Sequence, residues 1–135
     1  VTGMRERGYG RIINMSSINA VTAIPKASPY VICKGGVNQL TKVMALSLAD
    51  KGIRVNAISA GPMRTLAGSA IGDARYVFRH SEQNAPLQRN VNLDEVGNAA
   101  LYLLSDLSAG VTGEIHHVDG GFHAVGIPKP GTGSE

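Results

Sequence analysis

Three short apolar runs, separated by longer stretches of helical periodicity, constrain the fold of this chain most strongly. The runs are Arg11–Ser17, Ile53–Ser59 and Glu114–Val118, and each has the length of a buried strand. Strands that alternate with helices form parallel sheets, because right-handed crossovers bring successive strands side by side. The sequence therefore predicts an α/β fold with a parallel sheet.

The segments between these strands carry helix signals. Ser28-Pro29 predicts a helix start with Ser28 as the N-cap, and Lys51-Gly52 predicts its end. Apolar residues at three- and four-residue spacing mark the buried face of this helix: Val37, Leu40, Met44 and Leu48. Asn92 and Glu95 have the spacing of a capping box. The helix that follows has a predicted apolar side of Val96, Ala100, Leu103 and Leu104. Residues 65–90 lack a long period and predict a loop with short helices.

Composition excludes several other classes of protein. The net charge of +3 comes from scattered basic residues without a nucleic-acid motif, which argues against nucleic-acid binding. A single cysteine, Cys33, rules out an internal disulfide framework. His116 and His117 are adjacent, so in a strand they face opposite sides, and no metal site is expected. The longest apolar run, 99–104, is too short to span a membrane, and we expect a soluble, cytoplasmic protein.

Tyr30 and Lys34 form the pair with the clearest chemical meaning. They are four residues apart, so a helix presents both side chains on one face. A nearby ammonium group favours the phenolate form of a tyrosine, which suits a general acid. Taken alone, the pair also fits a surface tyrosine beside a solvated lysine. Ser17 ends the preceding strand, where its hydroxyl group could hydrogen-bond a substrate oxygen.

The surroundings of this pair resemble the short-chain dehydrogenase/reductase family. The matching features are a strand that ends Asn14-Met15-Ser16-Ser17, Tyr30 thirteen residues after Ser17, and Gly61-Pro62 after the next strand. The resemblance runs from about Gly8 to Phe122. It implies hydride transfer with NAD(H) or NADP(H). It also implies that the fold is part of a doubly wound, Rossmann-like parallel sheet, whose last three strands are the three expected here.

The resemblance also assigns roles to individual residues. Ser17 matches the serine that orients the substrate, Tyr30 the proton donor and acceptor, and Lys34 the lysine that holds the nicotinamide ribose. The cofactor-binding residues that the resemblance implies are Tyr30 and Lys34, together with Gly61, Pro62, Met63 and Thr65 in the segment after the middle strand. Residues 66–90 match the variable substrate loop, and Asp119-Gly120-Gly121 match a structural turn.

Two parts of the chain resemble different members of this family. Residues 8–52 are similar to carbonyl-reducing members such as 3-oxoacyl-carrier-protein reductase. From Ile53 onward the sequence resembles bacterial enoyl-acyl-carrier-protein reductase, which places its catalytic tyrosine seven residues before the lysine. That position is Ala27 here. The resemblance thus favours reduction of a carbonyl group, or oxidation of an alcohol, with enoyl reduction as the alternative.

The resemblance also bears on domain organisation and partners. Residues 1–127 correspond to the C-terminal, catalytic half of the family's domain, and 128–135 are expected to be a disordered tail. No Gly-rich nucleotide fingerprint is present in the sequence. A fragment without catalytic activity is therefore a third interpretation. The expected substrate is a small molecule or an acyl thioester, and relatives pair the helix that begins at Ser28, which predicts a homo-oligomer.

Overall fold

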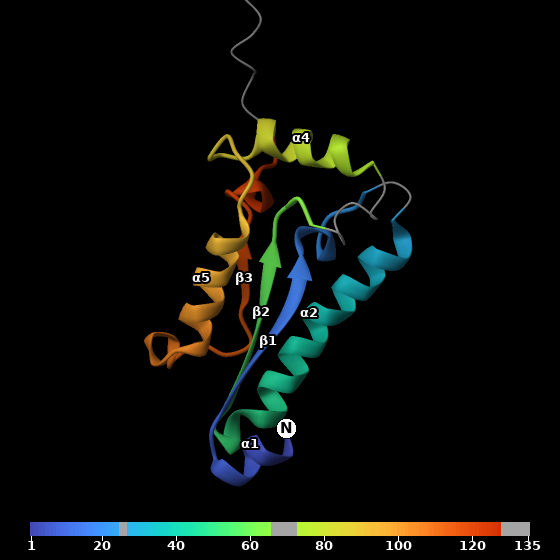
Figure 1. Ribbon diagram of the computed structural model, residues 1–135. Helices are drawn as coiled ribbons and strands as arrows, with labels where there is room; N and C mark the ends of the chain where they lie inside the picture. Colours follow the sequence, from blue (N-terminus) through green and yellow to red (C-terminus); the bar gives the residue numbers. More distant parts are fainter. Residues whose placement is uncertain (25–26, 66–72, 128–135) are drawn as a thin grey trace, which may run out of the picture.

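A parallel sheet forms the centre of the computed structural model, which describes residues 1–24, 27–65 and 73–127. Its strands are β1 (Gly10–Ser17), β2 (Ile53–Ala60) and β3 (Ile115–Val118), in the order β1-β2-β3 (Figure 1). Both pairings are parallel, with Gly10 opposite Ile53 and Ala57 opposite Ile115. All residues of β2 are buried, as expected for the middle strand of a covered sheet. The predicted α/β fold and its three strands are confirmed.

Helices and short turns connect and flank the strands. The α-helices are α1 (Thr2–Arg7), α2 (Ser28–Leu48), α4 (Ala74–Asn84) and α5 (Leu93–Leu104). Single 3₁₀ turns are η1 (Ile18–Ala20), η2 (Ala49–Lys51), η3 (Asp106–Ser108) and η4 (Phe122–Ala124). The segment 65–90 is predicted as a loop with short helices, and its described part consists of the 11-residue helix α4 followed by turns. No helix within the described ranges is long and apolar enough to cross a membrane.

The two long helices cover opposite faces of the sheet. Ala45 and Leu48 of α2 pack against Ile53 and Val55 of β2, whereas α5 packs against residues of the other parity, such as Ile58. Figure 1 shows α2 and α5 on either side of the strands. The chain passes from β1 to β2 through α2 and from β2 to β3 through α5, in the same direction across the sheet. Because α2 and α5 lie on opposite faces, these two crossovers have opposite hands. The prediction that both crossovers are right-handed is therefore wrong for one of them.

The start of α2 and its buried face also differ from the prediction. Ala27, rather than Ser28, is the N-cap, because the Ala27 carbonyl already accepts the first helical hydrogen bond from Val31 N–H at 3.0 Å. Leu40 is exposed, and the buried residues of the helix are Asn38, Thr41, Ala45 and Leu48. Apolar residues occur on two sides of this helix, so spacing alone could not select the side that faces the sheet.

The start of α5 is the predicted capping box. Asn92 Oδ1 accepts a hydrogen bond from Glu95 N–H at 2.9 Å, and Glu95 Oε2 accepts one from Asn92 N–H at 2.9 Å. Arg89 pairs with the same carboxylate at 2.6 Å and, as its largest influence, holds the pKa of Glu95 below its ordinary value. Val96 and Leu103 of this helix are buried as predicted, but Leu104 is 44% exposed.

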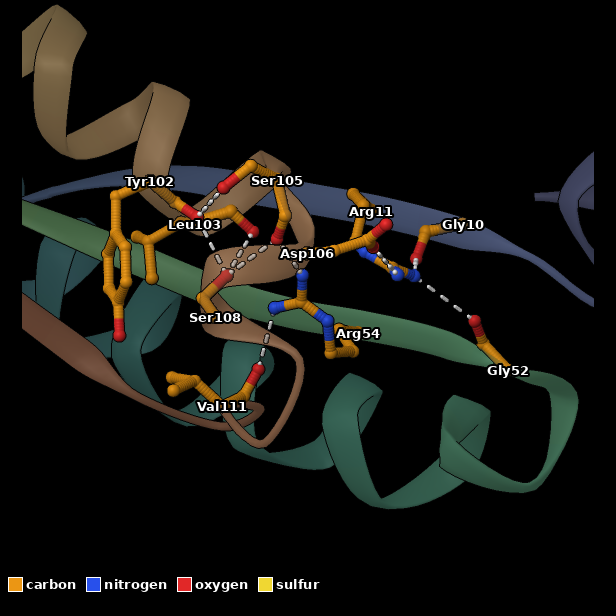
Figure 2. Close-up of polar contacts among 10 residues, drawn as sticks. All are labelled: Gly10, Arg11, Gly52, Arg54, Tyr102, Leu103, Ser105, Asp106, Ser108 and Val111. Atoms are coloured by element: carbon orange, nitrogen blue, oxygen red, sulfur yellow. Dashed lines mark hydrogen bonds and ion pairs between the residues drawn. The ribbon is translucent and has the colours of Figure 1, made fainter.

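A buried arginine joins the sheet to the connection between α5 and β3. Arg54 of β2 donates hydrogen bonds to the carbonyl oxygens of Ser105 at 2.9 Å and Val111 at 3.0 Å (Figure 2). Arg11 of β1 lies nearby and pairs with the exposed Asp106 at 3.3 Å. Burial lowers the pKa of the Arg54 guanidinium group, with Arg11 as the next cause. The cluster lies at the end of β2 away from its carboxyl terminus, so its role is structural.

Candidate active site

A cavity of about 770 Å³ lies at the carboxyl ends of β1 and β2. The ends of the two strands, η1, the start of α2, the segment after β2 and α4 all contribute to its wall. The lining residues are Met15, Ser16, Ser17, Ile18, Asn19, Ile24, Tyr30, Ala60, Gly61, Pro62, Met63, Arg64, Thr65, Ala74, Arg75, Val77, Phe78 and Arg79. This edge of a parallel sheet is where ligands bind in such folds. The predicted placement of Ser17 and residues 61–65 at one edge is therefore confirmed.

Tyr30 and Lys34 lie next to each other in the first turns of α2. The Lys34 ammonium group is 5.7 Å from the centre of the Tyr30 ring, as expected for residues one helical turn apart. Lys34 Nζ donates a hydrogen bond to the Met15 carbonyl at 2.6 Å, which ties it to β1. Tyr30 lines the cavity, whereas Lys34 is not among the lining residues. A polar group bound near Tyr30 would therefore meet a phenol with a cation at close range.

Ser17 is buried at the last position of β1 and lines the same cavity. Its hydroxyl oxygen accepts a hydrogen bond from Asn19 N–H at 3.2 Å, so the serine caps η1. Within the described residues, its hydroxyl proton has no acceptor. A hydroxyl that already accepts a hydrogen bond is well placed to donate one to a substrate oxygen. Ser17 and Tyr30 thus bring two hydroxyl groups to one cavity.

The segment after β2 forms another wall of this cavity. Gly61, Pro62, Met63 and Thr65 all line it, and their role in holding a cofactor stays a prediction. Gly61 N–H donates to the Val118 carbonyl at 2.9 Å. A Cβ atom at Gly61 would stand 2.9 Å from the Asp119 Cα atom, closer than real contacts allow. The backbone here can follow the cavity only because residue 61 is glycine.

Several lining residues were not singled out by sequence reasoning. Phe78 of α4 and Arg64 pack together, with the guanidinium carbon 5.0 Å from the ring centre. Arg75 and Arg79 come from the same helix. They fall within the predicted substrate loop 66–90, of which 66–72 lie outside the described residues. The segment 74–84 gave little signal for α4, because its apolar residues Val77 and Phe78 are adjacent and do not repeat at helical spacing.

The histidines are not part of the cavity wall. His80 stacks on Tyr76 at 5.8 Å between ring centres and is not part of the cavity wall. Asp119 is buried and accepts a hydrogen bond from His123 Nδ1 at 2.9 Å, if that nitrogen carries the proton. The His123 ring in turn stacks on His117 at 3.9 Å. Among the described residues, no group of three histidine, cysteine or acidic side chains could hold a metal ion.

The His117–His123 stack predicts a loss of stability in mild acid. Burial, followed by the charge of His123, lowers the pKa of His117 below its ordinary value of 6.5. Below that value the unfolded chain binds more protons at this position than the folded chain. The stabilising contribution is therefore present above about pH 6.5 and is lost as the pH falls through the lower, folded pKa. We expect the wild-type melting temperature to fall more steeply from about pH 7.5 to about pH 5.5 than that of His117→Asn. Parallel curves for the two proteins would contradict this assignment.

The fold and the site together define a class of protein. A parallel sheet with a serine at a strand end, followed by a tyrosine and lysine one turn apart on the next helix, is the arrangement that the resemblance to short-chain dehydrogenases/reductases implies. The model of a family described as "Enoyl-(Acyl carrier protein) reductase" matches residues 1–123. The chain belongs to this family, and the match includes the segment 8–52.

Named relatives agree with this membership. The chain is 51% identical over 118 residues to the NADH-dependent enoyl-[acyl-carrier-protein] reductase 1 of Rhizobium meliloti (strain 1021), which covers 87% of this chain and 43% of the relative. It is 45% identical over 111 residues to the FabI enzyme of Escherichia coli (strain K12), covering 82% of this chain and 42% of the relative. The chain thus spans somewhat less than half the length of these relatives.

Solved structures give the same result. The crystal structure of FabI from Candidatus Liberibacter asiaticus has a TM-score of 0.85 and 42% identity, covering 90% of this chain and 48% of that one. The Anaplasma phagocytophilum enoyl-(acyl-carrier-protein) reductase, solved in complex with NAD, has a TM-score of 0.84 and 46% identity. That comparison covers 91% of this chain and 47% of the other. The predicted Rossmann-like fold is therefore confirmed.

Proposed function

We propose that this chain is the catalytic part of an NAD(H)-dependent reductase that acts on an acyl thioester, with a 2-enoyl thioester as the leading substrate. The observation that carries the proposal is the cavity that collects Ser17, Tyr30 and residues 61–65 in a chain of the enoyl reductase family. Val77 and Phe78 of α4, which also line the cavity, offer apolar surface to an acyl chain. Relatives named as NADH-dependent support NAD(H) over NADP(H).

The residues present fit a nicotinamide nucleotide, which when bound supplies the hydride. Gly61 leaves its backbone without a side chain at the cavity wall, and Lys34 is held close to Tyr30. Lys34, Gly61, Pro62, Met63 and Thr65 would hold the nucleotide. Ser17 would donate a hydrogen bond to the thioester oxygen, and Tyr30 would supply the proton that the reduced product takes up.

Reduction of a 3-oxoacyl thioester is the second candidate, and the position of Tyr30 favours it. Carbonyl reduction needs a proton on the oxygen of the carbon that accepts the hydride. Tyr30, one turn before Lys34, and Ser17 both reach the cavity, as that chemistry requires. Ala27, seven residues before Lys34, is buried and has no proton to donate. The acid therefore occupies the position that the resemblance associates with carbonyl-reducing members.

A parallel assay with both thioesters distinguishes the two reactions. We expect NADH oxidation with the 2-enoyl substrate, and turnover of the 3-oxoacyl substrate instead would establish the second candidate. The Ala27→Tyr/Tyr30→Phe variant moves the phenol by about one helical turn and should shift any carbonyl activity toward enoyl activity. Turnover of neither thioester would overturn the proposal.

We also propose that residues 1–127 act together with a nucleotide-binding half. Among the described residues, the edge of β1 that faces away from β2 has no partner strand, and such an edge is complete only when another strand pairs with it. The assay above is therefore run on the chain alone and on the chain joined to the part of the Rhizobium meliloti relative that it does not cover. If the chain alone and the joined protein bound NADH equally tightly, the proposal that a separate half binds the nucleotide would be contradicted.

The exposed face of α2 predicts self-association. Ile32, Leu40, Val43 and Leu46 lie on one side of the helix, and each is more than half exposed. A helix side this apolar is stabilised when a second copy covers it. We expect a dimer or larger assembly by light scattering at micromolar concentration, and a monomer for Leu46→Arg. Leu107→Arg, at an equally exposed leucine of η3, is the matched control and should leave the assembly unchanged.

A further inference from the structure

Two polar side chains of α2 are buried against β1, where apolar residues would be expected. Asn38 is 9% exposed, and Thr41, one turn later, is fully buried. Asn38 lies on the same face as Tyr30 and Lys34, since the three residues follow one another at four-residue spacing. Neither residue belongs to the sequence motif that defined the candidate site. Burial of such groups is costly unless their polar atoms are paired.

Both side chains pair with residues of β1 that precede Ser17. Asn38 Oδ1 accepts a hydrogen bond from Ser16 Oγ at 2.5 Å. Thr41 Oγ1 accepts one from Asn14 Nδ2 at 2.9 Å and donates to the Val37 carbonyl at 2.8 Å. Lys34 Nζ donates to the carbonyl of Met15, the residue between Asn14 and Ser16. Three consecutive residues at the end of β1 are thus tied to three successive turns of α2.

The Ser16–Asn38 hydrogen bond is the one nearest to the candidate catalytic groups. Ser16 is bonded directly to Ser17, and both line the cavity, whereas Asn14 and Thr41 do not. Tyr30 and Lys34 belong to α2, and Ser17 belongs to β1, so the separation of their reacting groups depends on how the helix sits along the strand. A side-chain hydrogen bond between buried groups fixes that position more sharply than apolar contact, because it has a preferred direction and length.

We propose that Asn38 is a positioning residue for this site: through Ser16 it sets the place of Ser17 relative to Tyr30 and Lys34. This inference rests on the proposed function for its catalytic consequence. Asn38 does not line the cavity, so it acts through the strand end. A small displacement of reacting groups lowers the rate strongly, because the bound geometry must be close to that of the transition state.

The test compares two variants that each remove one tie. Asn38→Leu keeps a similar volume but loses the acceptor, and we expect kcat to fall about 10- to 100-fold while the KM for NADH changes less than about 3-fold. Thr41→Val removes the neighbouring tie at a more deeply buried position, and kcat should fall less than about 3-fold. An equal loss of kcat in both variants would show a general effect on packing and would overturn the proposal.

The partner residue tests whether Asn38 acts through Ser16. Ser16→Ala removes the same hydrogen bond from the strand side and serves also if Asn38→Leu does not fold. The double variant should be no slower than Asn38→Leu alone, since two residues that act through one bond are not additive. If the fold-loss of kcat in the double variant equalled the product of the two single losses, Asn38 would not act through Ser16.

Hydrogen exchange separates this inference from the proposed function. The amides of Ser17, Ile18 and Asn19 should exchange faster in Asn38→Leu than in the wild type, and at the wild-type rate in Thr41→Val. If the wild type reduces neither thioester, the proposed function fails and this comparison alone decides the positioning role. Unchanged exchange at these amides in Asn38→Leu would overturn it.

Discussion

Replacement of Tyr30 by phenylalanine is expected to lower kcat about 10²- to 10⁴-fold on whichever thioester the protein reduces, which is the usual contribution of a positioned general acid. Tyr30 is the described tyrosine that lines the cavity, and the Lys34 ammonium group lies 5.7 Å from its ring centre. The variant keeps the ring, so the packing at the start of α2 is retained. Initial-rate measurements with saturating NADH test this directly.

Tyr76→Phe is the matched control for this variant. Tyr76 lies on α4, which forms part of the cavity wall, but its own side chain is 66% exposed and outside that wall. The same loss of a hydroxyl group there should leave kcat within about 3-fold of the wild type. Equal rates for Tyr30→Phe and the wild type would show that another group supplies the proton, and would remove Tyr30 from the proposed mechanism.

The residues of the candidate site could be predicted because their positions follow from local geometry. A serine at the end of a parallel strand lies at the ligand edge of the sheet, and residues four apart on a helix share a face. These two rules are enough to bring Ser17, Tyr30 and Lys34 together. Ser17 and Tyr30 do line one cavity, and Lys34 does lie beside Tyr30, while their catalytic roles stay predictions.

The surroundings of those residues could not be predicted in the same way. Spacing favoured Leu40 as a buried residue of α2, but Asn38 and Thr41 take that side because their hydrogen-bond partners, Ser16 and Asn14, stand on β1. The side that a helix buries depends on the strand it meets, which is distant in sequence. A helix with apolar residues on two sides leaves that choice to tertiary contacts.

The role of Arg54 escaped prediction for a related reason. It was not singled out from the sequence; it is 9% exposed, and its partners lie more than fifty residues away. Asn56, on the same face of β2, donates to the Val111 carbonyl at 3.1 Å and accepts from Glu114 N–H at 3.0 Å. The two side chains thus supply hydrogen bonds to a connection whose regular structure is limited to the 3₁₀ turn η3.

Arg54→Met is therefore expected to lower the free energy of unfolding by about 2–4 kcal/mol, because methionine fills similar space but leaves the Ser105 and Val111 carbonyls without this donor. Urea denaturation of the two proteins measures the difference. Asp106→Asn is the control from the same cluster: the Asp106 side chain is 84% exposed, and its loss should cost less than about 1 kcal/mol. If both substitutions cost the same, the charge pair at the surface and not the buried guanidinium group would hold the connection between α5 and β3.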